Sequence, residues 1–398
     1  MANLEHLALI KQGVNAWNEW YKQHPKATPD FSQANLSNLN LSGVNFNKAN
    51  LKQANLANTD LSKSLLVNAN LERANLLKAN LADANLQGAN LDYVIFFQAT
   101  INRQTAIASK SLKVYEIVNN KVQNKNFSGV DLSNSHLFRA DLSNAELSKA
   151  KLVNVNFNRA NLSNAYLYKA DLSNANLQNA ELSNAYFSQA NLTSAYLGGA
   201  LCYGTYFKYA DLKFANLKTA EFNHKTMIDL KWYSVWEIVN HGAVKKNLSG
   251  ADLSNANLQG VNFEEANLTN AKLHHAILRD SNFNRANLTN AELVGANICG
   301  VNLNQANLKG AKLKSVISDR RTQLSASESA NNLIVQEQPA AIKAIAPSSA
   351  TTRASKNIIG ILFVAIIASI IATGYIFFNQ NLSYPWQERL QLWQEKLK

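Results

Sequence analysis

The residues that most often carry out chemistry in proteins are few in this chain and lie far apart. The seven histidines occupy positions 6, 24, 136, 224, 241, 274 and 275, and the two cysteines are Cys202 and Cys299. The cysteines belong to no CxxC pair and to no Cys/His cluster with the spacing of zinc ligands. Adjacent residues of an extended chain point in different directions, so we do not expect His274 and His275 to share a metal ion. Two isolated thiols also indicate a reducing compartment.

Motifs of common enzymes are missing as well. The sequence contains no GxxxxGK[ST], GxGxxG, HExxH or GxSxG pattern. Asp and Ser recur at regular intervals, as turn residues do, so their abundance does not indicate a catalytic triad. We therefore expect no catalytic residue, no cofactor, no metal ion and no small-molecule substrate, and the protein is not predicted to be an enzyme.

A repeat of five residues dominates the chain. From Asp30 to Ile101 a large apolar residue stands at every fifth position, usually with Ala two positions earlier, and the same pattern runs from Phe127 to Phe222 and from Leu248 to Leu313. A period of five fits neither an α-helix nor a plain strand, so each pentad must combine a short extended segment with a bend. Leu and Ala would then face one narrow core, and neighbouring coils must stack to bury it.

Runs such as 170–174 (ADLSN) and 266–270 (ANLTN) resemble the A(D/N)LXX signature of pentapeptide-repeat proteins. This resemblance implies an all-β solenoid, a right-handed quadrilateral β-helix with four pentads per coil. Departures from the signature are mild, with Val, Thr or Ser at some Ala positions and Cys202 at a Leu position. Together the three blocks hold about 49 pentads, which would make about twelve coils.

Two insertions separate the blocks, and they are copies of each other. Residues 99–132 match residues 220–253 at a constant offset of 121 without a gap. Apolar residues at helical spacing predict a short amphipathic helix in each insertion, and the N-terminus shows a similar face. The helices could cap the open ends of the solenoid, or Tyr115, Trp232 and Trp236 could form a partner-docking surface, and both readings stay open. We expect Trp236 to be buried, whereas Trp232 has the polar counterpart Ser111.

The C-terminal part has a different composition. Residues 314–357 are rich in Ser, Ala, Gln and Asn, which is typical of a flexible linker. Residues 358–378 then contain no charge, and 21 residues of helix are long enough to cross a bilayer. A tail with Trp386 and Trp393 on one face follows. Met1–Tyr21 lacks the apolar core of a signal peptide, so we expect a tail-anchored protein with a cytosolic repeat domain. The choice between plasma and thylakoid membrane stays open.

The domain organisation follows from these patterns. The predicted segments are an N-terminal amphipathic capping helix (1–29), repeat block 1 (30–101), a helical insertion (102–125), repeat block 2 (126–222), a second helical insertion (223–246), repeat block 3 (247–313), a flexible linker (314–357), a transmembrane helix (358–378) and a short amphipathic tail (379–398).

Charge helps to choose between functions. The net charge is +12, but the three blocks carry only about 0, +1 and 0, and most of the excess lies in the insertions, the linker and the tail. A mimic of DNA that regulates a DNA enzyme would need a strongly negative surface, and we expect no nucleic-acid partner. A lipid-handling factor would need an apolar groove that the sequence does not show. The favoured function is a membrane-anchored scaffold or spacer that binds unknown proteins.

Overall fold

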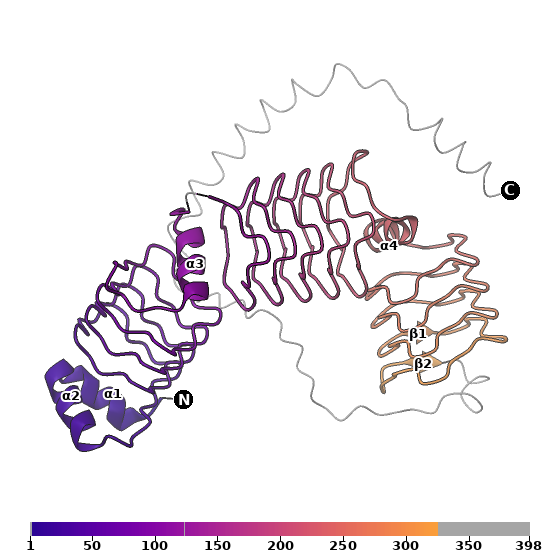
Figure 1. Cartoon of the computed structure of the whole chain (residues 1–398). Coiled ribbons are helices and arrows are strands. Elements are labelled where there is room, and N and C mark those ends of the chain that lie inside the picture. The colour runs from indigo at the N-terminus through magenta and orange to yellow at the C-terminus, as the bar shows by residue number, and fades with distance from the viewer. Residues whose placement is uncertain (1, 123, 325–398) are drawn as a thin grey trace, which may run out of the picture. The chain divides into compact units, whose positions relative to one another are not determined.

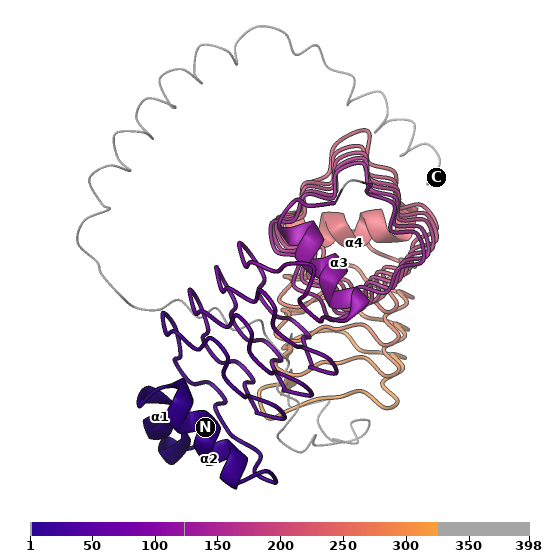
Figure 2. The same ribbon diagram turned by 60° about the vertical axis from the view of Figure 1, so that its left-hand side comes forward.

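The computed structural model describes residues 2–122 and 124–324, which form stacked coils together with short helices (Figure 1). Residues in the coils pair through parallel bridges with residues twenty positions later, as Asp30 does with Asn50 and Asn247 with Asn267. Twenty residues are four pentads, so each coil has four sides. Figure 2 looks along the coils of the second block, whose outlines overlie one another.

Each pentad contains a bend and a backbone hydrogen bond to the next coil, and the series of these bonds forms a parallel ladder along the stack. The amide of Phe31 donates to Asn50 O at 2.8 Å, and the amide of Ala34 turns back to Phe31 O at 3.0 Å. The bend places Gln33 at φ 61°, a left-handed conformation that L-residues avoid. Its amide then donates to Lys52 O of the next coil at 2.8 Å, so the bend adds another hydrogen bond along the stack. This geometry recurs at nearly every corner of the solenoid.

Asparagine is abundant before the apolar residue because its side chain can form hydrogen bonds both within its own turn and with the neighbouring coil. Oδ1 of Asn75 accepts from the amide of Leu77 at 3.0 Å, which fixes the local turn. Its Nδ2 donates to Oδ1 of Asn55, one coil earlier, at 3.1 Å. Aspartate at the same position keeps the turn, as Asp131 does with the amide of Ser133 at 2.9 Å.

The core is a column of alternating large and small apolar side chains. Leu172 and Ala170 have no exposed surface, and the same holds for most Leu and Ala positions of the second block. Where Ser or Thr replaces Ala, the hydroxyl usually donates to a carbonyl of the previous coil, as Ser281 does to Leu258 O at 2.9 Å. Ser64 differs, because among the described residues its buried hydroxyl has no hydrogen-bond partner.

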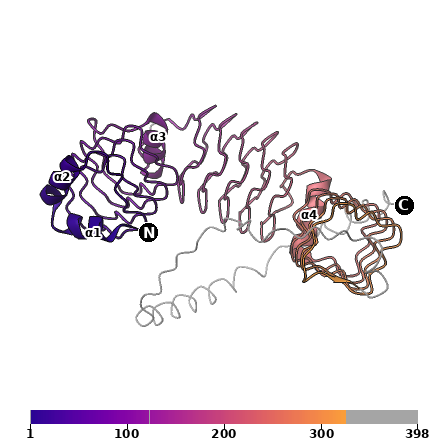
Figure 3. The same cartoon turned by 90° about the horizontal axis from the view of Figure 1, so that it is seen from below.

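The N-terminal segment was predicted as one helix over 1–29, and this was wrong. It forms two helices, α1 (Leu4–Lys11) and α2 (Val14–Gln23), because Gly13 adopts φ 117° between them. They lie at the first coils (Figure 3). Trp17 of α2 is fully buried, and its indole N–H donates to Asn45 O at 2.8 Å. The pair therefore covers this end of the first block.

Helices occur in both insertions, α3 (Ser109–Val118) and α4 (Leu230–His241). Near the C-terminal end of each helix, the side-chain amide of an Asn forms hydrogen bonds with backbone groups of the preceding coil. Nδ2 of Asn119 donates to Phe96 O at 3.1 Å and its Oδ1 accepts from the amide of Gln98 at 2.7 Å. Asn240 makes the same two contacts with Leu217 O and the amide of Thr219. Each insertion helix thus caps the block before it.

The predicted linker begins too early, because residues 314–324 still belong to the solenoid. Ile317 bridges Asn297, Val316 is buried, and β1 (Asn302–Leu303) pairs in parallel with β2 (Gln323–Leu324). The sequence of this segment departs from the pentad pattern, but its backbone continues the ladder. The rest of the predicted linker, the predicted span 358–378 and the predicted tail lie outside the described residues.

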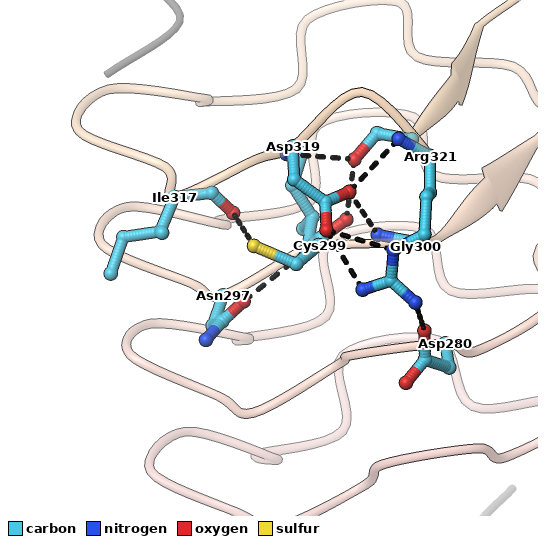
Figure 4. A network of polar contacts seen from close by, with 9 residues as sticks. Asp280, Asn297, Cys299, Gly300, Ile317, Asp319 and Arg321 are labelled. Carbon is cyan, nitrogen blue, oxygen red and sulfur yellow. Dashed lines mark hydrogen bonds and ion pairs between the residues drawn. The ribbon is translucent and has the colours of Figure 1, made fainter. Parts of the chain in front are cut away.

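The last turn is held by side chains around Cys299 (Figure 4). The amide of Gly300 donates to Oδ1 of Asp319 at 2.8 Å, and the guanidinium of Arg321 contacts Asp319 at 2.8 Å and Asp280 at 2.7 Å. Burial raises the pKa of the Cys299 thiol, so it remains protonated near neutral pH. The same turn, an Asn or Asp followed three residues later by Thr, ends the first and second blocks.

Two serines at alanine positions are expected to respond to substitution with opposite sign. Ser64→Ala removes a buried hydroxyl without a partner and should raise the free energy of unfolding by about 1 kcal/mol, whereas Ser281→Ala removes a hydrogen bond and should lower it by a similar amount. Thermal melts followed by circular dichroism measure both changes. Equal effects of the two variants would contradict the hydrogen-bond assignment.

Candidate functional site

Aromatic side chains that are half-buried or exposed gather on one side of the second block. Tyr166, Tyr186 and Tyr206 are twenty residues apart, so they stand above one another in successive coils. Their rings stack with centroids 4.8 Å apart at both steps and interplanar angles of 7° and 18°. Tyr209 and Met227 extend the group with exposed fractions of 67% and 53%. We call these five residues the tyrosine face.

The tyrosine face has no charged side chain among its five residues, and both lysines and the carboxylates of Glu146 and Asp229 border it. Desolvation raises the pKa of both Tyr166 and Tyr206, so their hydroxyls stay protonated and can donate hydrogen bonds. Lys149, Lys169 and Lys208 are exposed in the same coils. Lys169 Nζ lies 5.1 Å from the centroid of the Tyr168 ring. The arrangement can bind another molecule through ring edges, hydroxyls and ammonium groups.

A second feature is a cleft where α4 meets the last coils of the second block. It is a shallow depression that is largely open to solvent, with a volume of about 390 Å³. We call it the α4 cleft, and it is lined by Tyr203, Thr219, Ala220, Glu221, Phe222, Trp236, Asn240 and His241. Trp236 is held in place there, because its ring stacks on Phe222 at 4.7 Å and its indole N–H donates to Ala220 O at 2.8 Å.

The three predicted docking residues have different surroundings. Tyr115 and Trp232 are 2% and 8% exposed, so neither offers a docking surface, and this part of the prediction was wrong. Trp236 was expected to be buried, yet it is half-buried and opens onto the α4 cleft. The physical reason is helix geometry: Trp232 faces the packed side of α4 with Val235, whereas Trp236 lies at the rim against Phe222.

The two histidines of the pair have different surroundings. His274 Nε2 lies 2.6 Å from Oε2 of Glu292, which also pairs with Lys312 at 2.9 Å. His275 occupies the left-handed corner at φ 55° and is exposed. In the part of the chain that the structure describes, no three His, Cys, Asp or Glu side chains are grouped as metal ligands would be.

Sequence reasoning missed the tyrosine face and the acidic side of the α4 cleft. The signal for the first was present, because tyrosines recur at a spacing of twenty, the length of one coil. The contact of Tyr203 with Glu221 joins successive coils across eighteen residues, as the contact of His274 with Glu292 does in the third block.

A comparison with known families agrees with this architecture. The family described as pentapeptide repeats matches residues 30–66, 64–103, 126–164, 156–193, 185–223, 247–285 and 281–317, more than half of the chain. The chain belongs to the pentapeptide-repeat family. Such proteins fold as right-handed quadrilateral β-helices, in agreement with the four-sided coils described above. Members of the family are generally non-enzymatic structural or regulatory proteins.

Several solved structures are similar to this pentapeptide-repeat protein. HetL, a protein involved in heterocyst differentiation regulation from the cyanobacterium Nostoc sp. strain PCC 7120, is 26% identical over 76% of this chain and 96% of its own, with a TM-score of 0.17. AT2G44920 from the Arabidopsis thaliana thylakoid lumen is 29% identical over 29% of this chain and 79% of its own, with a TM-score of 0.26. These TM-scores are too low for the similarities to indicate a function. No curated relative matches the chain.

The helices of the described residues are 8 to 12 residues long. Within residues 2–122 and 124–324, none is both long and apolar enough to span a bilayer. The predicted span lies outside this range.

The two tryptophans of α4 are expected to behave differently. Trp232→Ala removes a buried ring and should cost about 3 to 5 kcal/mol of unfolding free energy, whereas Trp236→Ala should cost less because part of its ring already contacts water. Acrylamide quenching of single-Trp variants gives an independent measure, with stronger quenching at position 236. Stronger quenching at position 232 would contradict the packing of α4.

Proposed function

We propose that this protein is a non-enzymatic scaffold or spacer, held at a membrane by its C-terminal segment, whose repeat domain presents docking surfaces to other proteins on the cytosolic side. The tyrosine face carries this proposal. Stacked rings are already ordered, so they lose little conformational freedom when a partner covers them, and tyrosine is enriched at protein interfaces. Contiguous exposed aromatic groups on a soluble domain typically mark a binding surface.

The proposed attachment to a membrane is supported by the sequence after the repeat domain. Residues 358–378 are uncharged, and Lys343, Arg353 and Lys356 precede them, where basic residues can contact anionic lipid headgroups. Such an anchor would hold the docking surfaces at the membrane and raise the local concentration of the proteins bound to them.

A second candidate function, imitation of DNA, has less support. In the second block, lysines border the tyrosine face at Lys149, Lys169 and Lys208, whereas a mimic of the phosphate backbone needs rows of carboxylates. The near-neutral charge of all three blocks favours protein docking over competition with nucleic acid.

The tyrosine face is tested with the intact membrane form. Tyr166→Ser combined with Tyr206→Ser removes two rings of the stack and should reduce proximity labelling of the partners by roughly tenfold, the effect of losing about 1.4 kcal/mol of binding energy. Tyr196→Ser is the matched control, because Tyr196 is 40% exposed on another side of the same block. Labelling that is unchanged in the double variant, or equally reduced in the control, would contradict the proposal.

The anchor is tested by truncation. A chain that ends after Arg353 lacks the uncharged segment and should move from the membrane fraction to the soluble fraction, because no other long apolar stretch is present in the sequence. Its circular dichroism melt should match that of the full chain. Retention on membranes after a high-salt wash would place the anchor elsewhere.

A further inference from the structure

The two insertions are copies in sequence, and their differences point to a binding site. At the offset of 121, Tyr115 of the first insertion corresponds to Trp236 of the second. Both rings pack against the last coils of the block before them, Tyr115 near Phe96 and Trp236 on Phe222. Tyr115 is 2% exposed, whereas Trp236 is half-buried and lines the α4 cleft.

A lysine accounts for part of this difference. In the first insertion, Lys121 Nζ lies 4.8 Å from the centroid of the Tyr115 ring and donates a hydrogen bond to its hydroxyl. The counterpart of Lys121 in the second insertion is Gly242, which has no side chain to place there. The first insertion therefore places a lysine on this aromatic ring, whereas in the second insertion the ring of His241 lies edge-on to Trp236 with centroids 5.3 Å apart.

The second copy has also replaced small or apolar residues around this position by groups that suit a cation. Among the residues that line the α4 cleft, three such replacements are Tyr203 for Ala82, Glu221 for Thr100 and Phe222 for Ile101. The lining also has Thr219 in place of Gln98 and His241 in place of Asn120. Aromatic rings attract cations through their negative faces, and a carboxylate adds a charge-assisted hydrogen bond.

Glu221 is the charged group of the cleft. Its Oε2 accepts a hydrogen bond from the hydroxyl of Tyr203, which orients the carboxylate. This contact raises the pKa of Tyr203 and keeps its hydroxyl a donor. Glu221 is exposed, and none of the ion pairs formed within residues 2–122 and 124–324 involves it, so its carboxylate is accessible to a cation from another molecule.

We propose that the α4 cleft binds the cationic end of a lysine or arginine side chain from a partner polypeptide, with Glu221 and the rings of Trp236 and Tyr203 as its contacts. The inference rests on the proposed scaffold function and names the chemistry of one partner. A side chain is favoured over a free small cation, because the group that meets the equivalent ring in the first insertion is itself a lysine side chain.

The test uses the full-length protein in detergent micelles and fluorescein-labelled short peptides that differ at one central residue, which is lysine, arginine or the uncharged norleucine. Fluorescence anisotropy should show that the lysine and arginine peptides bind, with the norleucine peptide weaker by roughly tenfold or more. Glu221→Gln should weaken binding of the lysine peptide by a similar factor. Trp236→Phe should retain most of the affinity, and Trp236→Leu should lose it.

The matched control is Glu181→Gln. Glu181 lies in the same row of the block, two coils before Glu221, and does not line the cleft. Its substitution should leave peptide binding unchanged, and circular dichroism melts show that each variant is folded. Equal binding of the norleucine peptide, or equal effects of the two Glu→Gln variants, would overturn the proposal.

Competition by tetramethylammonium distinguishes a site for a free small cation from a site for a charged side chain. We expect it to compete only weakly with the lysine peptide. Displacement of the lysine peptide by tetramethylammonium at the same concentration as unlabelled lysine peptide would make the cleft a small-cation site and overturn the proposal. Absence of binding by every probe would also overturn it. The tyrosine variants test the scaffold function separately. A failure of the peptide experiment can therefore be distinguished from a failure of the scaffold function.

Discussion

The parallel ladder along the solenoid is the constraint on which the rest of the structure depends. A residue pairs with the residue twenty positions later where the coil between them contains four pentads of equal length, and only the last bridges of each block span twenty-one positions. This requirement fixes the left-handed corners, the buried Leu and Ala columns and the Asn side chains that join one coil to the next. A residue inserted into one pentad would shift every later apolar side chain away from the core.

A ladder of this kind always leaves unpaired backbone groups and apolar surface at its ends. At three places, an Asn side chain satisfies backbone groups at the edge of a coil. Its side-chain amide donates one hydrogen bond and accepts another. Asn18 of α2 contacts the first block, and Asn119 and Asn240 contact the last coils of the first and second blocks. The Asn at these positions is therefore explained by capping.

Because inward positions are fixed by the fold, outward positions are free to differ between blocks. The second block uses this freedom most, with the tyrosine face along its coils and the α4 cleft at its end. In the first insertion, the aromatic ring at the position equivalent to Trp236 is covered by Lys121. The repeated coils thus form a rigid support for both insertions. The aromatic ring of the first insertion is buried, whereas the ring of the second insertion lines a surface suited to binding.

The sequence by itself determined the family, the pentad core, the block order and the presence of helices in the insertions, because a five-residue period has one structural solution and is visible residue by residue. Only the tertiary structure decided that Gly13 divides the N-terminal helix and that residues 314–324 continue the solenoid, since these depend on a single φ angle and on backbone pairing. It also decided that Trp232 is buried while Trp236 faces a cleft, because the rotation of α4 against the coils sets which ring meets water.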